Sequence, residues 1–212
     1  MRTFAILPVK SFPAAKQRLR ESLPPAPRED LVEAMFRDVI SSLRTTSVDG
    51  ILVVTASPTA RAIAVAHGAE VLQDRETGHN AAAALGVEAA RSRGAERALL
   101  VPGDCPALDP SELDELLRRE VSIPSVLVVP DRHGTGTNAL LLTPPDALAS
   151  SFGPGSCQRH LELAAAHDVS AEVAEVPSLA LDIDTLDDLE SLAGVGDRAP
   201  ETRRLLGQLS AC

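Results

Sequence analysis

The feature that most constrains this chain is an alternation of short apolar runs with segments of helical periodicity. Runs rich in Val, Leu and Ile, such as residues 51–55 and 125–129, are bounded by Gly, Pro or Asn and have the length of strands buried on both faces. Between them lie segments such as residues 28–43, in which apolar side chains recur at helical spacing. This alternation predicts a three-layer α/β domain with a mostly parallel sheet.

We expect the elements at defined positions along the 212 residues. Strands are predicted at residues 3–8, 51–55, 70–73, 98–102, 125–129, 139–142 and 171–176. Helices are predicted at residues 28–43, 58–67, 81–92, 110–120 and 202–209, and a further helix opens within residues 152–160 and runs to about residue 167. A chain of this length forms one α/β domain with a substantial core and is short for two. We therefore assign a single domain to residues 1–212, with a C-terminal tail from about residue 194.

Composition and charge argue against several classes of partner. The chain has 2% aromatic residues, without Trp or Tyr, and a net charge of −10, so we expect neither nucleic acid nor an anionic membrane as partner. The spacing of Cys105, Cys157 and Cys212 indicates neither a disulfide framework nor a zinc motif. The sequence has no signal-peptide pattern and no apolar run near the roughly 20 residues of a membrane span. It therefore predicts a cytoplasmic protein.

Positive charge is concentrated around the first predicted strand. The first twenty residues contain Arg2, Lys10, Lys16, Arg18 and Arg20, and Lys10 and Lys16 are the only lysines in the chain. A compact ammonium is a good point-charge partner for phosphate. Two interpretations fit this segment alone: a loop that wraps a phosphorylated ligand, or a surface loop with solvated lysines. No dinucleotide-binding Gly-x-Gly-x-x-Gly motif follows the strand.

A second group of candidate residues is acidic. The apolar run of residues 99–101 ends in Pro-Gly, and Asp104 follows at the predicted turn. In open α/β sheets the carboxyl ends of strands face the ligand crevice, so Asp104 either caps this turn or holds a divalent cation against phosphate. Asp182 and Asp184 alternate on one face of an extended segment, and we expect them to meet Asp104. Two or three carboxylates with open positions suit Mg²⁺.

Two glycine-rich segments are candidate anion-binding loops. Residues 130–138 and 152–160 combine glycine with hydroxyl and amide side chains, which allows the backbone to approach an anion closely. For residues 130–138 the alternative is a plain hairpin connection. Asn80 precedes an alanine-rich helix, where it either caps the helix or hydrogen-bonds a base or ribose. His160 is interpreted as a helix-face residue rather than a base.

Together these features favour nucleotidyl transfer. A basic loop, an acidic metal site and two anion loops offer more phosphate-binding capacity than a single phosphate needs. In this reaction a substrate phosphate attacks the α-phosphorus of a nucleoside triphosphate in line, and pyrophosphate leaves. Catalysis then rests mainly on positioning and charge neutralisation. A phosphate nucleophile is already ionised at neutral pH, which agrees with the lack of a convincing His or Glu base in the sequence.

The ordered set of motifs resembles one enzyme family. The motifs are ILPVK, AKQRL, VVTASP, GHNAA, LVPGDCPAL, DRHGTGTNAL, FGPGSCQRH and LALDIDTLDDL. From about Thr3 to Leu189 they are similar to the 2-phospho-L-lactate and phosphoenolpyruvate guanylyltransferases of deazaflavin coenzyme F-420 biosynthesis. The resemblance implies a Rossmann-like, glycosyltransferase-A-like nucleotidyltransferase fold with a mostly parallel mixed sheet. It also implies GTP as co-substrate, Mg²⁺ as cofactor and a three-carbon phosphorylated acid as acceptor.

The resemblance implies roles for individual residues at the nucleotide site. Lys10 and Lys16 match lysines that contact the triphosphate, with Arg18 as a helper, and together with Asp104 these lysines form the expected catalytic set. Asn80 matches a position near the nucleoside, where the preference for guanine is expected to be set. The nucleotide site as a whole is assigned to Pro8, Lys10, Lys16, Arg18, Asn80 and Gly103.

The same resemblance implies an acid site and a metal site. Thr137, Gly153 and Ser156 match residues that hold the three-carbon acid, largely through backbone N–H groups. Asp104 matches the acid that binds Mg²⁺. Asp184 best matches the second metal ligand, and Asp182, which faces the same way, is the alternative.

The sequence departs from the pattern of this family at two positions. Cys105 stands where a larger apolar residue is usual, and His79 where Leu is common. The Arg- and Ala-rich composition favours phosphoenolpyruvate over 2-phospho-L-lactate, by analogy with high-GC bacterial members.

One alternative is a cytidylyl- or molybdopterin-directed nucleotidyltransferase, although those usually carry a Gly-Gly-x-Ser-x-Arg loop after the first strand. Another is a nucleotide sensor without turnover. A homodimer is one option for assembly, and the resemblance implies that the product passes to the next transferase of the pathway.

Overall fold

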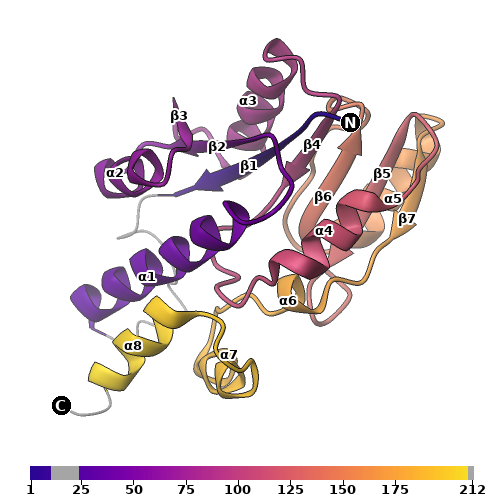
Figure 1. Ribbon diagram of the computed structural model, residues 1–212. Coiled ribbons are helices and arrows are strands. Elements are labelled where there is room, and N and C mark those ends of the chain that lie inside the picture. Colours follow the sequence, from indigo (N-terminus) through magenta and orange to yellow (C-terminus); the bar gives the residue numbers. More distant parts are fainter. Residues whose placement is uncertain (11–23, 210–212) are drawn as a thin grey trace.

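The computed structural model describes residues 1–10 and 24–209 (Figure 1). The strands are β1 (Thr3–Val9), β2 (Gly50–Thr55), β3 (Glu70–Gln73), β4 (Arg97–Leu100), β5 (Ser125–Pro130), β6 (Thr137–Thr143) and β7 (Ser170–Val173). The helices are α1 (Pro25–Leu43), α2 (Pro58–Ala66), α3 (His79–Ser92), α4 (Pro110–Arg118), α5 (Ser156–Ala166), α6 (Pro177–Ala180), α7 (Leu186–Ser191) and α8 (Pro200–Leu209). A short 3₁₀ helix spans Leu192–Gly194.

The strands form one mixed sheet in the order β3-β2-β1-β4-β6-β5-β7. The pairs β1–β2, β1–β4, β2–β3 and β5–β7 are parallel. β6 is antiparallel to both of its neighbours, β4 and β5. The start of β6 therefore lies at the edge of the sheet where its neighbours end.

Helices cover both faces of the sheet (Figure 1), and β1 shows how the sequence supplies two cores. Ala5 and Leu7 belong to the core shared with α1, α2 and α4, whereas Phe4 and Ile6 belong to the core shared with α3 and α5. Successive side chains of a strand point to opposite faces. A continuous apolar run is therefore what a strand buried on both faces requires, and the predicted three-layer α/β architecture is confirmed.

Two helices begin earlier than the sequence predicts. α1 starts at Pro25 instead of residue 28, because proline in a first turn lacks only an N–H group that has no intrahelical partner. α3 starts at His79 and follows Gly78, whose φ of 121° favours glycine. Asn80 thus lies inside the first turn, and the interpretation of Asn80 as the helix cap is wrong.

The C-terminal tail packs against the rest of the domain. α8 lies along α1 (Figure 1). The buried carboxylate of Asp38 in α1 accepts the N–H of Glu201 at 3.0 Å, the N–H of Thr202 at 2.9 Å and the hydroxyl of Thr202 at 2.7 Å. The first N–H groups of a helix have no intrahelical partner, so Asp38 supplies the acceptor that α8 needs.

The segment before the C-terminal acids differs from the expectation. The strand predicted at residues 171–176 ends at Val173, and α6 occupies the residues just before Leu181. The residues around Asp182 and Asp184 are therefore anchored by a helical turn instead of following directly from a strand. Within the described residues, no helix combines the length and the apolar character that crossing a membrane requires.

Candidate active site

The carboxyl edge of the sheet gathers residues that are far apart in the chain. Lys10 follows β1, Asp74 follows β3, and Asp104 lies in the loop after β4. Because β6 runs in the opposite direction, its first residue, Thr137, lies at the same edge. Along the strand order, this edge carries Asp74, Lys10, Asp104 and Thr137 in succession. Ligands of open α/β sheets bind at such an edge.

The acidic candidates converge at this edge. The N–H of Ile183 donates to the carbonyl oxygen of Asp104 at 3.1 Å, so the loop after β4 and the segment of the C-terminal acids lie side by side. Burial, and after it the negative charge of Asp104, raises the pKa of the Asp182 carboxyl, with a further contribution from Asp184. The structure thus brings together the three carboxyl groups that the sequence predicts to meet.

Asn138 and Cys105 support the segment that carries these acids. The Nδ2 of Asn138 donates to Oδ1 of Asp182 at 3.2 Å and to the carbonyl oxygen of Leu179 at 2.7 Å. The Sγ of Cys105 donates to the same carbonyl at 3.4 Å, and Cys105 is fully buried. Cys105 therefore contacts, from the protein interior, the segment that leads to Asp182 and Asp184.

The carboxylates fit a magnesium ion that also binds substrate. Among residues 1–10 and 24–209, no group of three or more His, Cys, Asp and Glu side chains is placed to hold a metal ion. Mg²⁺ usually takes only one or two protein carboxylates and completes its shell with water and phosphate oxygens. Asp104 together with Asp182 or Asp184 offers that number. Burial is the main cause of the raised pKa of Asp182, and the repulsion from Asp104 that adds to it is what a nearby cation relieves.

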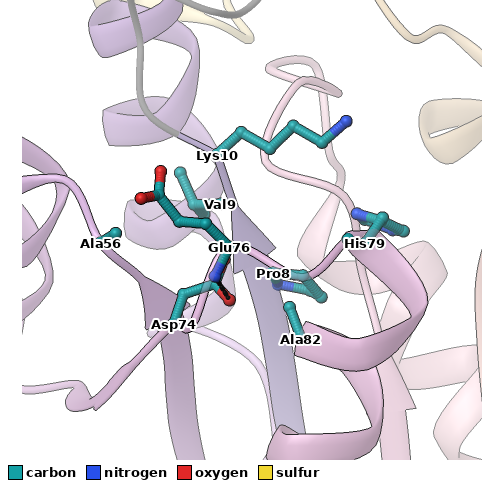
Figure 2. Close-up of a pocket in the computed structure, with 9 residues that line it drawn as sticks. Pro8, Val9, Lys10, Ala56, Asp74, Glu76, His79 and Ala82 are labelled. Carbon is teal, nitrogen blue, oxygen red and sulfur yellow. Dashed lines mark hydrogen bonds between the residues drawn. The ribbon is translucent and has the colours of Figure 1, made fainter.

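A pocket of about 160 Å³ opens beside Lys10 at the end of β1 (Figure 2). Its wall contains the apolar residues Pro8, Val9, Ala56 and Ala82 and the polar side chains Lys10, Asp74, Glu76 and His79. Burial, followed by the positive charge of Lys10, lowers the pKa of His79 against the opposing charges of Asp104 and Asp74. The lowered pKa favours the neutral form of His79 at pH 7, and Lys10 places a positive charge at this pocket.

A smaller hollow of about 40 Å³ adjoins this pocket. Pro8 and His79 line both, and the smaller one extends to Thr137, Asn138 and Phe152. Pro8, which the resemblance assigns to the nucleotide site, lines both hollows. The nucleotide side and the acid side of the predicted site are contiguous.

Thr137 is oriented by a buried histidine. The Nε2 of His160 accepts the N–H of Ser151 at 2.9 Å, so the ring proton is on Nδ1, which donates to Oγ1 of Thr137 at 3.0 Å. Burial, and after it the charge of Arg159, lowers the pKa of His160 to about 4. The hydroxyl of Thr137 accepts from His160, and its own proton can be donated to a ligand oxygen. The interpretation of His160 as a structural residue agrees with these contacts.

The Asn80 side chain holds a loop. Its Oδ1 accepts the N–H of Phe152 at 2.8 Å, and its Nδ2 donates to the carbonyl of the same residue at 3.2 Å. The Phe152 ring lies edge-on to His79, with centroids 5.1 Å apart, and to His160, with centroids 5.5 Å apart. Asn80 thus joins the start of α3 to the loop before α5, whereas the resemblance implies a contact with the nucleoside.

The loop between β5 and β6 does not present its N–H groups as predicted. The Asp131 carboxylate accepts the N–H groups of His133 at 3.1 Å, Thr135 at 2.9 Å and Gly136 at 2.9 Å. A Cβ on Gly136 would lie 2.5 Å from Oδ2 of Asp131, which explains the glycine. These N–H groups bind the carboxylate of Asp131, which belongs to the same loop. The prediction that they bind a ligand anion is therefore wrong.

The start of α5 carries two of the predicted acid-site residues. Gly153 has a φ of 128°, a conformation that favours glycine, and its carbonyl accepts the N–H of Ser156 at 3.1 Å. Ser156 is buried, and the N–H of Cys157 donates to the carbonyl of Thr135 at 3.2 Å. This places Gly153 and Ser156 next to the loop that leads into Thr137.

Of the cations in the first twenty residues, the structure describes Arg2 and Lys10, and these two lie far apart. Lys16 and Arg18 lie outside the described residues, as do Arg20 and Cys212. Arg2 lies at the opposite edge of the sheet, where its backbone N–H donates to Glu96 at 2.6 Å. The seven residues of β1, each rising about 3.3 Å, separate Arg2 from Lys10, so the grouping of these two is wrong. Gly103 lies in the loop after β4, close to Val9.

Sequence reasoning gave no role to several residues of this edge. Asn138 and Phe152 lie within the motifs DRHGTGTNAL and FGPGSCQRH, so their place in the motif was the available signal. Asp74 comes directly after the strand predicted at residues 70–73. The rule that ligands bind beyond the carboxyl ends of strands pointed to Asp74 as much as to Asp104.

Comparison with known proteins gives matches over the whole chain. Residues 3–209 match the family model described as guanylyl transferase CofC like. The phosphoenolpyruvate guanylyltransferase of Conexibacter woesei is 49% identical over 216 residues, covering 99% of this chain and 97% of that protein. The 3-phospho-D-glycerate guanylyltransferase of Colwellia psychrerythraea is 37% identical over 194 residues, covering 91% of this chain and 92% of that protein.

A solved structure from Desulfovibrio desulfuricans G20, described as a nucleotide-diphospho-sugar transferase, matches with a TM-score of 0.76 at 15% identity, covering 100% of this chain and 96% of the other. At that identity the likeness concerns the fold, which is the nucleotidyltransferase-like α/β fold expected from the motifs. The sequence matches show the family as well as the fold, because they extend along nearly the full chain and include relatives that are more than one third identical. The chain belongs to the CofC-like guanylyltransferase family.

Proposed function

We propose that this protein transfers GMP from GTP to phosphoenolpyruvate, forming enolpyruvyl-2-diphospho-5′-guanosine and pyrophosphate. The relative from Conexibacter woesei, at 49% identity, is a phosphoenolpyruvate guanylyltransferase. On the same grounds as the resemblance of the motifs, we place the reaction in the biosynthesis of coenzyme F-420, where the product is consumed by the next transferase of the pathway.

The observation that carries this proposal is the order of chemical groups along one sheet edge. A pocket lined by Lys10 adjoins a hollow that reaches Thr137, and the loop of Asp104 lies against the segment of Asp182. A nucleoside triphosphate and a phosphorylated acid can therefore bind next to each other, with acidic metal ligands beside them. Transfer between two bound phosphates needs this adjacency.

Each residue has a part in positioning the reactants. The Lys10 ammonium contacts phosphate oxygens of GTP, and the hydroxyl of Thr137, whose oxygen accepts from His160, donates to the acid. An oxygen of the acid's phosphate attacks the α-phosphorus, a new P–O bond forms, and the bond to the β-phosphate oxygen breaks. The nucleophile is ionised at neutral pH, so no protein base has to remove a proton.

The residues of this site fit a magnesium ion that oxygen atoms of both the protein and the substrates would coordinate. Asp104, with Asp184 or Asp182, would hold the ion, and its remaining positions would go to phosphate oxygens and water. When bound, the ion neutralises charge on the phosphates. As the motif AKQRL implies, Lys16 and Arg18 are proposed to add positive charge for the triphosphate.

Other acceptors and nucleotides are the competing candidates. The relative from Colwellia psychrerythraea is a 3-phospho-D-glycerate guanylyltransferase, so that acid stands beside 2-phospho-L-lactate as an alternative. A cytidylyl- or molybdopterin-directed enzyme and a sensor without turnover are the remaining alternatives from the sequence. These candidates differ in the pairs of substrates that release pyrophosphate.

The test is an assay of the purified protein with Mg²⁺ and each pairing of GTP, CTP, ATP or UTP with one of the three acids. We expect pyrophosphate release with GTP and phosphoenolpyruvate, and we expect it to stop when magnesium is chelated. Coupling to the next pathway enzyme removes a product that is unstable or inhibitory. If no pyrophosphate is released with GTP and any of the three acids, the proposal is overturned. A preference for CTP would remove the guanylyl assignment.

A further inference from the structure

The pocket beside Lys10 contains two carboxylates to which the transfer chemistry gives no task. Asp74 and Glu76 lie on one side of the pocket, opposite His79 and Ala82 (Figure 2). The volume of about 160 Å³ is below the roughly 300–1,000 Å³ of pockets that take a whole drug-sized ligand. It suits one flat ring system whose attached groups extend toward Lys10.

Asp74 is the better fixed of the two carboxylates. Its backbone N–H donates to the carbonyl of Thr55 at 3.1 Å, which continues the pairing of β3 with β2 beyond the last residue of β3. Its Oδ1 accepts the N–H of Glu76 at 2.9 Å. A carboxylate has about four lone-pair positions, so this contact orients the group and leaves acceptor capacity on both oxygens.

Glu76 has an unusual backbone at this point. Its φ is 56°, a left-handed conformation that is unfavourable for a non-glycine residue. The turn from Asp74 to Glu76 is thereby held in a shape that directs the N–H of Glu76 at the Asp74 carboxylate. Strain of this kind is often found next to ligand sites.

Asn80, the residue expected to select guanine, is engaged elsewhere. Both polar atoms of its amide are paired with the backbone of Phe152, at 2.8 and 3.2 Å, and Asn80 is not among the residues that line the pocket. The preference for guanine therefore needs a different group, and that group has to face the pocket.

A carboxylate matches guanine better than any other base. Guanine presents two adjacent donors, N1–H and N2–H, and a carboxylate presents two adjacent acceptors. Adenine and cytosine combine one amino donor with an unprotonated ring nitrogen, which repels a carboxylate oxygen. Uracil has a single N–H between two carbonyl oxygens.

We infer that the Asp74 carboxylate reads the N1–H and N2–H edge of guanine, held in position by the N–H of Glu76. The inference deepens the proposed function and rests on it, since it concerns the nucleotide of the same reaction. A purine in this pocket lies against Pro8, Val9 and Ala82, and its triphosphate extends past Lys10 toward Asp104, in the order of the strands.

The test compares GTP, ITP and ATP as substrates of the wild-type protein and of Asp74→Asn. ITP lacks only the N2 amino group of guanine, and the wild type is expected to prefer GTP over ITP by about tenfold or more. Asp74→Asn is expected to lower kcat/KM for GTP about 10- to 100-fold and to reduce the GTP-to-ITP preference to within about threefold. The new amide can accept from N6–H and donate to N1 of adenine, so use of ATP relative to GTP is expected to rise.

Matched controls separate this role from a structural one. Asn retains Oδ1 and with it the contact to Glu76, so the melting temperature of Asp74→Asn is expected to match that of the wild type. Asp146→Asn makes the same replacement at an exposed residue that pairs with Arg91 near the far end of α3, and it is expected to keep the wild-type ratios. A merely structural defect would lower all three activities and would not raise the share of ATP.

The possible failures can be told apart. If the wild type releases no pyrophosphate with any nucleotide and acid, the proposed function fails, and ranking GTP, ITP and ATP by thermal shift still tests the base preference. If the wild type uses GTP but Asp74→Asn keeps its ratios among the three nucleotides, only this inference is overturned. If Glu76→Gln loses the GTP-to-ITP preference and Asp74→Asn keeps it, Glu76 is the residue that recognises guanine. That result would also overturn the inference.

Discussion

Lowering the pH from 7.5 to 5 is expected to destabilise this protein through His160. The ring is fully buried, its Nε2 accepts the N–H of Ser151 at 2.9 Å, and its Nδ1 donates to Thr137 at 3.0 Å. A second ring proton would point at the N–H of Ser151, so two donors would face each other. Burial, and after it the charge of Arg159, accordingly lowers the pKa of His160 to about 4.

The sign and size of the effect follow from the two pKa values. An unfolded histidine has a pKa of about 6.5, above the folded value. The contribution of His160 to stability is therefore complete above pH 6.5 and is lost as the pH falls toward the folded pKa. The interval between 6.5 and about 4 corresponds to about 3 kcal/mol in full, of which about 2 kcal/mol is lost by pH 5.

Urea unfolding at pH 7.5 and pH 5 measures this loss in the wild type and in His160→Gln. The Gln amide can accept from Ser151 and donate to Thr137 but does not titrate, and the other titrating groups are present in both proteins. The wild type is expected to lose about 2 kcal/mol more than the variant. Equal losses, within about 0.5 kcal/mol, would refute the reasoning that His160 is neutral and buried.

Three further substitutions test individual contacts. Asp104→Asn is expected to lower kcat about 100-fold or more with a melting temperature near the wild-type value, and undiminished pyrophosphate release would place the metal ligands elsewhere. Asn80→Ala removes both hydrogen bonds to Phe152, so KM for the acid is expected to rise about tenfold and KM for GTP much less; equal rises would contradict this role. Asp38→Ala removes the acceptor for the start of α8 and is expected to cost about 2 kcal/mol in urea unfolding, whereas a cost near zero would show that α8 contributes little.

The sequence by itself determined the elements and the chemistry available at their ends. β1 could be predicted because its residues are all buried, and burial on both faces leaves a continuous apolar run in the sequence. Asp104 could be predicted because strand direction determines which edge a following loop joins. Both rules act over a few residues, so an uninterrupted stretch of chain carries the whole signal.

Tertiary structure alone decided which polar groups meet. Asn80 could cap a helix, read a base or hold a loop, and its pairing with Phe152 depends on how the loop before α5 packs over α3. Asp131 gave no sign that its own loop would wrap around it. An amide or carboxylate bonds equally well to many donors, so its partner is set by which strands are neighbours. Here that depends on β6 entering the sheet antiparallel between β4 and β5, an arrangement that no local pattern in the sequence specifies.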